Sequence, residues 1–139
     1  MLKDEAEKYL ELGAERGEEY SYNCAEIMLN AANDYYKLGM DKRALNMVLP
    51  FGGGMYREKD CGMLTGGAAA LGAIFTEEKP SKNLKVQEAT GLWVEKFEEE
   101  FKSVNCRVIK KENLQENESC DGLILKAADL LEEVISKYK

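Results

Sequence analysis

The sequence contains no histidine, and this absence removes several kinds of chemistry before any motif is considered. A Cys–His nucleophile pair, an imidazole general base and a C-x-x-C-H haem attachment all require a histidine. A metal site of the E-x-x-H type is excluded on the same ground. Metal ligation or catalysis in this chain therefore has to come from other side chains, above all from its 4 cysteines.

Proline is also scarce, with 2 residues in 139, which favours long helices. The longest stretch of low charge, residues 61–75, is too short to span a bilayer. The first residues are acidic where a secretory signal needs an apolar segment. We therefore expect a soluble, cytoplasmic protein without membrane insertion. In a reducing cytosol, cysteines bind metal or react more often than they form disulfides.

The chain also lacks a cluster of basic residues along its sequence, and its net charge is −7. An acidic chain repels the phosphates of nucleic acids and the headgroups of anionic membranes, so we expect neither as a partner. The hydrophobic fraction of 45% and the charged fraction of 32% are typical of a globular protein. The length suits one domain with its own core, which we assign to residues 1–139.

Apolar residues recur at helical spacing along most of the chain, and no alternating run predicts a strand. We expect an all-α fold, a single-domain helical bundle of about five to six helices. Residues 61–75 are rich in glycine and alanine and apolar on nearly every side, which predicts a buried central helix. A polar connection over residues 77–82, containing Pro80, separates it from a long amphipathic helix.

Other segments show one-sided helical patterns. Asp41 is expected to cap a short helix over residues 42–49, which Pro50 ends. The inner stripe of the long helix consists of Ala89, Trp93, Phe97 and Phe101. The inner stripe of the last helix consists of Leu123, Ala127, Leu130 or Leu131, Val134 and Tyr138.

Each cysteine follows a residue that commonly caps a helix, so all four are expected in the first turn of a helix. Free backbone N–H groups and the positive end of the helix dipole favour a thiolate there and lower its pKa. Arg57, Lys59 and Arg107 would strengthen this effect if they point inward. The expected caps and cysteines are Ser21 with Cys24, Asp60 with Cys61, Asn105 with Cys106, and Ser119 with Cys120.

Three readings of the cysteines remain open at this stage. Four helix beginnings that converge could hold an iron–sulfur cluster or another metal through four thiolates. Zinc is disfavoured because the usual C-x₂-C pair is absent. The same cysteines could instead exchange disulfides in pairs, or they could be ordinary core residues, since free cysteine is among the most buried residue types.

Glycines precede and interrupt the central helix. The run Gly52, Gly53 and Gly54 lacks the G-K-[ST] ending of a phosphate-binding loop, so it predicts a sharp turn or a close approach to the cysteine site. Gly62 and Gly66 lie inside the expected helix, where glycine costs about 1 kcal/mol relative to alanine. Tight helix packing explains them, and so does a cofactor pressed against this face. We treat all five glycines as candidate cofactor-binding residues.

Five segments of the chain combine cysteines and glycines in a recognisable order. They are Tyr22 to Glu26, Phe51 to Met55, Cys61 to Gly66, Asn105 to Arg107, and Ser119 with Cys120. Together they resemble the family named "putative redox-active protein", which is defined by four cysteines and a C-G-A-x-x-G motif. The resemblance covers nearly the whole chain and keeps the order of the cysteines. Met63 stands where the family usually has alanine, and its larger side chain would narrow a cofactor pocket.

This resemblance implies a helical fold and a redox role, without a substrate. The leading hypothesis is a four-cysteine redox site of Cys24, Cys61, Cys106 and Cys120, binding an iron–sulfur cluster or another metal for electron transfer or sensing. It would make the protein an oxidoreductase or an electron carrier, whose partner is a redox protein or a small-molecule thiol. The alternatives are a thiol–disulfide protein and a helical interaction module with core cysteines. A homo-oligomer is compatible with each.

Overall fold

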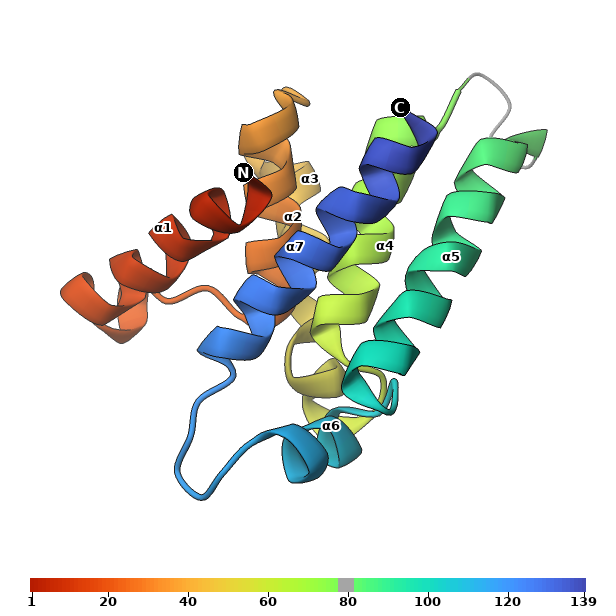
Figure 1. Cartoon of the computed structure of the whole chain (residues 1–139). Coiled ribbons are helices and arrows are strands. Elements are labelled where there is room, and N and C mark those ends of the chain that lie inside the picture. The colour runs from red at the N-terminus through yellow and green to blue at the C-terminus, as the bar shows by residue number, and fades with distance from the viewer. Residues whose placement is uncertain (78–81) are drawn as a thin grey trace.

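The computed structural model describes residues 1–77 and 82–139, and these residues form seven α-helices (Figure 1). The predicted all-α class is confirmed. The number of helices is slightly higher than expected, since the two short helices α3 and α6 are counted with the longer ones. Residues 78–81 of the predicted polar connection lie outside the described residues. The helices are α1 (Leu2–Arg16), α2 (Cys24–Tyr36), α3 (Lys42–Asn46), α4 (Gly62–Phe75), α5 (Leu84–Phe101), α6 (Cys106–Asn113) and α7 (Asp121–Tyr138).

Three short helical turns connect some of these helices. The turn η1 (Glu18–Tyr20) precedes α2, whereas η2 (Leu49–Phe51) and η3 (Gly54–Glu58) lie between α3 and α4. Because η2 contains Pro50, α3 ends earlier than the predicted helix over residues 42–49. None of the helices in the described part of the chain combines the length and apolar character needed to cross a bilayer.

Helix α4 occupies the middle of the bundle, as its composition predicts, with α2 on one side and α5 on the other. Its glycines allow these neighbours to come very close. A Cβ at Gly66 would lie 2.6 Å from the carbonyl oxygen of Ala25 in α2. A Cβ at Gly67 would lie 2.6 Å from the indole of Trp93 in α5, whose Nε1 donates to the Leu64 carbonyl at 2.9 Å.

The predicted inner stripes of the two long helices form much of the core. On α5, the four residues of the stripe are fully buried, namely Ala89, Trp93, Phe97 and Phe101. On α7, Leu131 rather than Leu130 takes the inner position, and Tyr138 is half-buried. These stripes pack α5 and α7 against each other and against α4, so one hydrophobic core serves the whole bundle.

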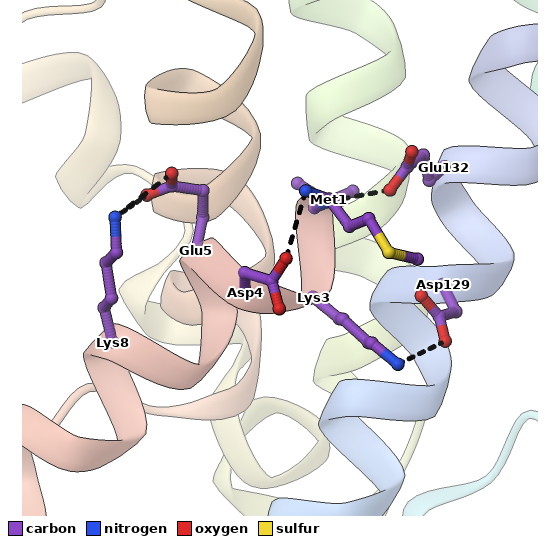
Figure 2. Close-up of polar contacts among 8 residues, drawn as sticks. Met1, Lys3, Asp4, Glu5, Lys8, Asp129 and Glu132 are labelled. Atoms are coloured by element: carbon purple, nitrogen blue, oxygen red, sulfur yellow. Dashed lines mark hydrogen bonds and ion pairs between the residues drawn. The ribbon is translucent and has the colours of Figure 1, made fainter.

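Helix α1 is attached to α7 by contacts near its first residue (Figure 2). The backbone N–H of Leu2 donates to a carboxylate oxygen of Glu132 at 2.7 Å, and Lys3 pairs with Asp129 at 3.7 Å. The ion pair is about half exposed, and such pairs contribute little to stability. Burial of Leu2 and Ala6 therefore supplies most of the attachment energy.

The helix beginnings differ from the sequence expectation at three of five caps. Asp41 caps α3 and Asn105 caps α6, as predicted. Asn23, rather than Ser21, caps α2, and its side chain and that of Glu26 form a reciprocal capping box. Helices α4 and α7 have cysteines at the cap position itself, one residue later than expected, namely Cys61 in place of Asp60 and Cys120 in place of Ser119.

We predict that Gly66→Ala destabilises the protein by about 1–3 kcal/mol, because the new methyl group must push the α2 backbone away. The matched control is Gly91→Ala in α5, where nothing lies within 4 Å of the new Cβ. This control should stabilise the protein by about 0.5–1 kcal/mol, since alanine is the better helix former. Urea unfolding followed by circular dichroism measures both. Equal effects of the two substitutions would contradict the close contact.

Candidate functional site

All four cysteines line one cavity of about 220 Å³, which is partly open to solvent. Cys61 and Cys106 are buried, Cys24 and Cys120 are half-buried, and all four are free thiols. The sequence separates them widely, but the fold brings them together at the end of the bundle where α2, α4 and α7 begin (Figure 1). The other residues that line the cavity are Asn23, Gly53, Met63, Ile109, Lys110 and Ile124.

The contact between α2 and α4 sets the place of the first two cysteines. Cys24 is the first residue of α2, and Cys61 is the cap of α4. A Cβ at Gly62 would lie 2.5 Å from Cys24 Sγ and 2.9 Å from the carbonyl oxygen of Phe51. Glycine at position 62 therefore leaves the space that the Cys24 sulfur occupies beside the beginning of α4.

A short antiparallel backbone pairing sets the place of the third cysteine. Asp60 and Asn105 form an isolated β-bridge. The N–H of Cys61 donates to the carbonyl of Val104 at 2.8 Å, and the N–H of Cys106 donates to the carbonyl of Lys59 at 2.6 Å. This pairing holds the beginnings of α4 and α6 side by side, so that both cysteines face the same cavity.

The glycine loop folds into an unusual left-handed turn next to Cys106. Gly53, Gly54, Met55 and Tyr56 have φ angles of 56°, 64°, 57° and 58°. A Cβ at Gly54 would lie 2.5 Å from the backbone nitrogen of Lys59, and 3.0 Å from Cys106 Cβ. The left-handed conformation costs about 1–2 kcal/mol at each residue that is not glycine. The loop therefore turns sharply and approaches the site closely, and it holds Met55 and Tyr56 in strained conformations.

The five candidate glycines differ in their place relative to the cavity. Gly53 lines it, and Gly54 and Gly62 pack directly against two of its cysteines. Gly52 packs against Asn23, whose side chain donates to the Leu49 carbonyl at 2.9 Å. Gly66 lies one turn further along α4 and serves the contact with α2. A role of these glycines in binding a cofactor stays a prediction.

Burial changes the pKa values of three thiols more than their positions at helix beginnings do. It raises the pKa of Cys61 to about 12, although the N–H groups of Met63 and Leu64 favour the thiolate. It also raises the pKa of Cys106 and that of Cys120, against the opposing effect of the Lys110 cation. The expectation of lowered pKa values is therefore wrong for these three cysteines, because the cavity removes them from water.

Lys110 is the cation that reaches the thiols, and the sequence analysis missed it. Its ammonium group lowers the pKa of Cys106 and that of Cys120 and so favours their thiolates, although burial outweighs this effect. Arg57 and Arg107, which were considered for this role, are exposed; Arg57 donates to the carbonyl of Tyr56 and Arg107 pairs with Glu58. Lys110 follows Cys106 by four residues on α6, and this i, i+4 spacing was the available signal.

Within residues 1–77 and 82–139, no group of three or more cysteine, aspartate or glutamate side chains is arranged to hold a metal ion. The four thiols are nevertheless close enough to affect one another electrostatically, since Cys24 raises the pKa of the other three. The site is therefore a cavity surrounded by thiols, not a preformed mononuclear metal site.

The fold and this cavity define a small all-α protein with a site composed of four cysteines. Residues 22–134 match the protein family described as "Putative redox-active protein (C_GCAxxG_C_C)", and the chain belongs to this family. The matched segment includes all four cysteines and the glycine loop. No curated protein and no solved structure matches the chain. The family description indicates a redox-active protein, in agreement with the resemblance noted from the sequence.

The raised pKa of Cys61 predicts a pH-dependent contribution to the stability of the metal-free, reduced protein. Because its pKa is higher in the folded than in the unfolded chain, this contribution is complete below about pH 8.5, the ordinary thiol pKa. It is lost as the pH rises toward the folded value, by at most about 1.4 kcal/mol per pH unit. The stability lost in Cys61→Ala, measured by urea unfolding, should therefore shrink between pH 8 and pH 10.5.

The control for this measurement is Ile124→Ala, which also enlarges the cavity but removes no titratable group. Its effect on the free energy of unfolding should be the same at every pH. A Cys61→Ala effect that is equally constant would show that the thiol is not desolvated as described.

Proposed function

We propose that this protein binds an iron–sulfur cluster through Cys24, Cys61, Cys106 and Cys120 and uses it for electron transfer or sensing. The observation that carries this proposal is the presence of all four cysteines around one cavity, each from the beginning of a different helix. Iron–sulfur clusters are commonly held by four cysteine thiolates.

The lining of the cavity supports a soft metal centre. Among the described residues that line it, no carboxylate is present, so hard cations such as Mg²⁺ and Ca²⁺ find none of the anionic oxygens they prefer. Met63, Ile109 and Ile124 provide an apolar wall. Such a wall limits access of water and tunes the potential of a bound centre.

The arrangement of the described cysteines argues against a single zinc ion. Zn–S bonds of about 2.3 Å in a tetrahedron bring each pair of sulfurs to about 3.8 Å. The described cysteines do not form such a group. The four thiols around the cavity would instead hold a cluster, which needs four cysteine ligands and would supply one-electron redox chemistry.

A bound cluster would supply one-electron chemistry, and the protein would hold it and balance its charge. Each thiol gives up its proton on ligation. The Lys110 ammonium beside Cys106 and Cys120 offsets part of the negative charge that results, and the N–H groups of Met63 and Leu64 do so at Cys61. Gly53 lines the cavity without a side chain that would enter the volume of a cluster, and Gly54 and Gly62 leave room for Cys106 and Cys24 to approach it.

A second function, thiol–disulfide exchange, is favoured by the backbone pairing that joins the beginnings of α4 and α6, from which Cys61 and Cys106 line the same cavity. In that reaction two thiols lose two electrons and two protons and form one S–S bond. An external disulfide accepts them and leaves as two thiols. This reaction requires no metal, so it can be separated experimentally from the first proposal.

Anaerobic incubation of the purified protein with ferrous iron, sulfide and a thiol reductant should give a brown protein containing bound iron and sulfide. Cys61→Ser should lower the iron content strongly, since it removes the most buried ligand. Ile109→Val is the matched control, because it changes the same cavity without removing a sulfur. Iron and sulfide analysis with visible and electron paramagnetic resonance spectra are the measurements.

A colourless, iron-free product would contradict the cluster. In that case the metal-free protein is treated with oxidised glutathione, and the free thiols are counted before and after reduction. A reversible loss of two or four thiols would then assign the protein to thiol–disulfide exchange, and four thiols that stay free would refute this function as well.

A further inference from the structure

We infer that an exposed surface beside the cysteine cavity is a docking site for an acidic electron-transfer protein. We call this surface the rim. Its use as an entry for electrons rests on the proposed function, but its existence as a binding surface does not. The rim consists of Met55, Tyr56 and Arg57 from η3 and Arg107, Val108 and Lys111 from α6.

Contacts on both sides connect the rim to the cavity. Asn23, which lines the cavity, donates from its side chain to the Tyr56 hydroxyl at 3.4 Å. Arg107 pairs with Glu58 at 3.3 Å and thereby joins α6 to η3. Lys110, another lining residue, lies within the same turn of α6 as Arg107 and Lys111. A protein that covers the rim would therefore lie on the elements that carry Gly53, Cys106 and Lys110, next to the cavity.

The strained turn displays two apolar side chains toward solvent. Met55 and Tyr56 are 47% and 59% exposed, although both have left-handed backbone conformations that are unfavourable for their residue types. Their side chains do not contribute to the core in return. Tyrosine, methionine and arginine are the residues enriched in protein interfaces, and backbone strain concentrates at functional sites. Strain that exposes Met55 and Tyr56 thus points to a partner that contacts them.

The rim region carries the opposite charge to the rest of the chain. Residues 54–60 and 105–113 contain five basic and three acidic side chains, a net charge of +2 in a chain of −7. By contrast, residues 1–20 contain seven acidic and three basic side chains. The fold therefore gathers a local basic surface that the linear sequence does not display.

This charge separation selects the kind of partner. A compact protein with an acidic patch is attracted by the rim and repelled by the remaining surface, which orients it toward the rim and the neighbouring cavity. A long nucleic-acid duplex or an extended anionic membrane would also meet the acidic remainder of the chain, with its net charge of −9 outside the rim region. An acidic protein is therefore the occupant that the charges favour.

The test uses an acidic flavodoxin and a basic cytochrome c as probes of opposite charge. Binding to the metal-free protein is measured by isothermal titration, which needs no cluster and so stays informative if the proposed function fails. Flavodoxin should bind at low salt and lose about tenfold in affinity by about 200 mM salt, because the attraction is electrostatic. If only cytochrome c binds in this way, the overall negative charge governs encounters and the inference is wrong.

Two double variants with the same change in net charge locate the contact. Arg107→Gln with Lys111→Gln should weaken flavodoxin binding about tenfold at low salt. Lys3→Gln with Lys8→Gln, which removes two cations from α1, should leave binding within about twofold of the wild type. Equal effects of the two pairs would overturn the assignment of the rim, as would rim-dependent binding of a DNA duplex or of anionic lipid vesicles without binding of flavodoxin.

Met55→Gly separates a binding role from a structural one. Glycine tolerates the left-handed conformation at position 55, so the urea midpoint should stay the same or rise. The affinity for flavodoxin should nevertheless fall several-fold, because the exposed side chain is gone. Unchanged affinity would contradict the inference, whether or not the urea midpoint changes. If a cluster can be loaded, stopped-flow electron transfer from reduced flavodoxin should follow the same order among the variants.

Discussion

The backbones of α2 and α4 lie so close together that no side chain fits between them at Gly62 and Gly66. This contact sets the position of the cysteine cavity, because Cys24 begins one of these helices and Cys61 caps the other. The pairing between Asp60 and Asn105 then adds the beginning of α6. Small residues and one backbone bridge thus bring together a site from widely separated parts of the chain.

The environment of the thiols contains two opposing influences. Helix beginnings and the Lys110 cation favour negative charge, whereas burial disfavours it, and in the free protein burial prevails at three of the four cysteines. A group that brings positive charge into the cavity, as iron does, would reverse the balance. The same N–H groups and the same lysine would then stabilise the thiolates, as the proposed cluster requires.

Much of the fold could be predicted from the sequence because it follows from local periodicity. The i, i+4 stripe that ends at Phe101 and the apolar character of residues 61–75 both specify burial directly. The convergence of the cysteines could also be anticipated from their places at helix beginnings. The caps were less predictable, since Ser21 and Asn23 give equivalent local signals, and Asp60 is engaged in a bridge with a residue 45 positions away.

Other features of the site depend on tertiary structure and had no clear signal. Met55 and Tyr56 are poor candidates for left-handed conformations, so the turn that exposes them could not be read from their residue types. Burial raises the pKa values of three thiols, and the position of a cysteine at the beginning of a helix does not reveal how deeply it is buried. Lys110 could have been found from its spacing to Cys106, but only with knowledge of which face of α6 meets the cavity.

Trp93 is the only tryptophan of the chain and is completely shielded from solvent, with its indole against Gly67 of α4. The tryptophan fluorescence of the protein therefore originates at one place, the contact between the central helix and α5. The Leu64 carbonyl that accepts its N–H lies one turn beyond the residue that caps this helix at the cavity. Tryptophan fluorescence of the native protein thus reports whether α4, the helix on which the cysteine site depends, is intact, and it needs no added label.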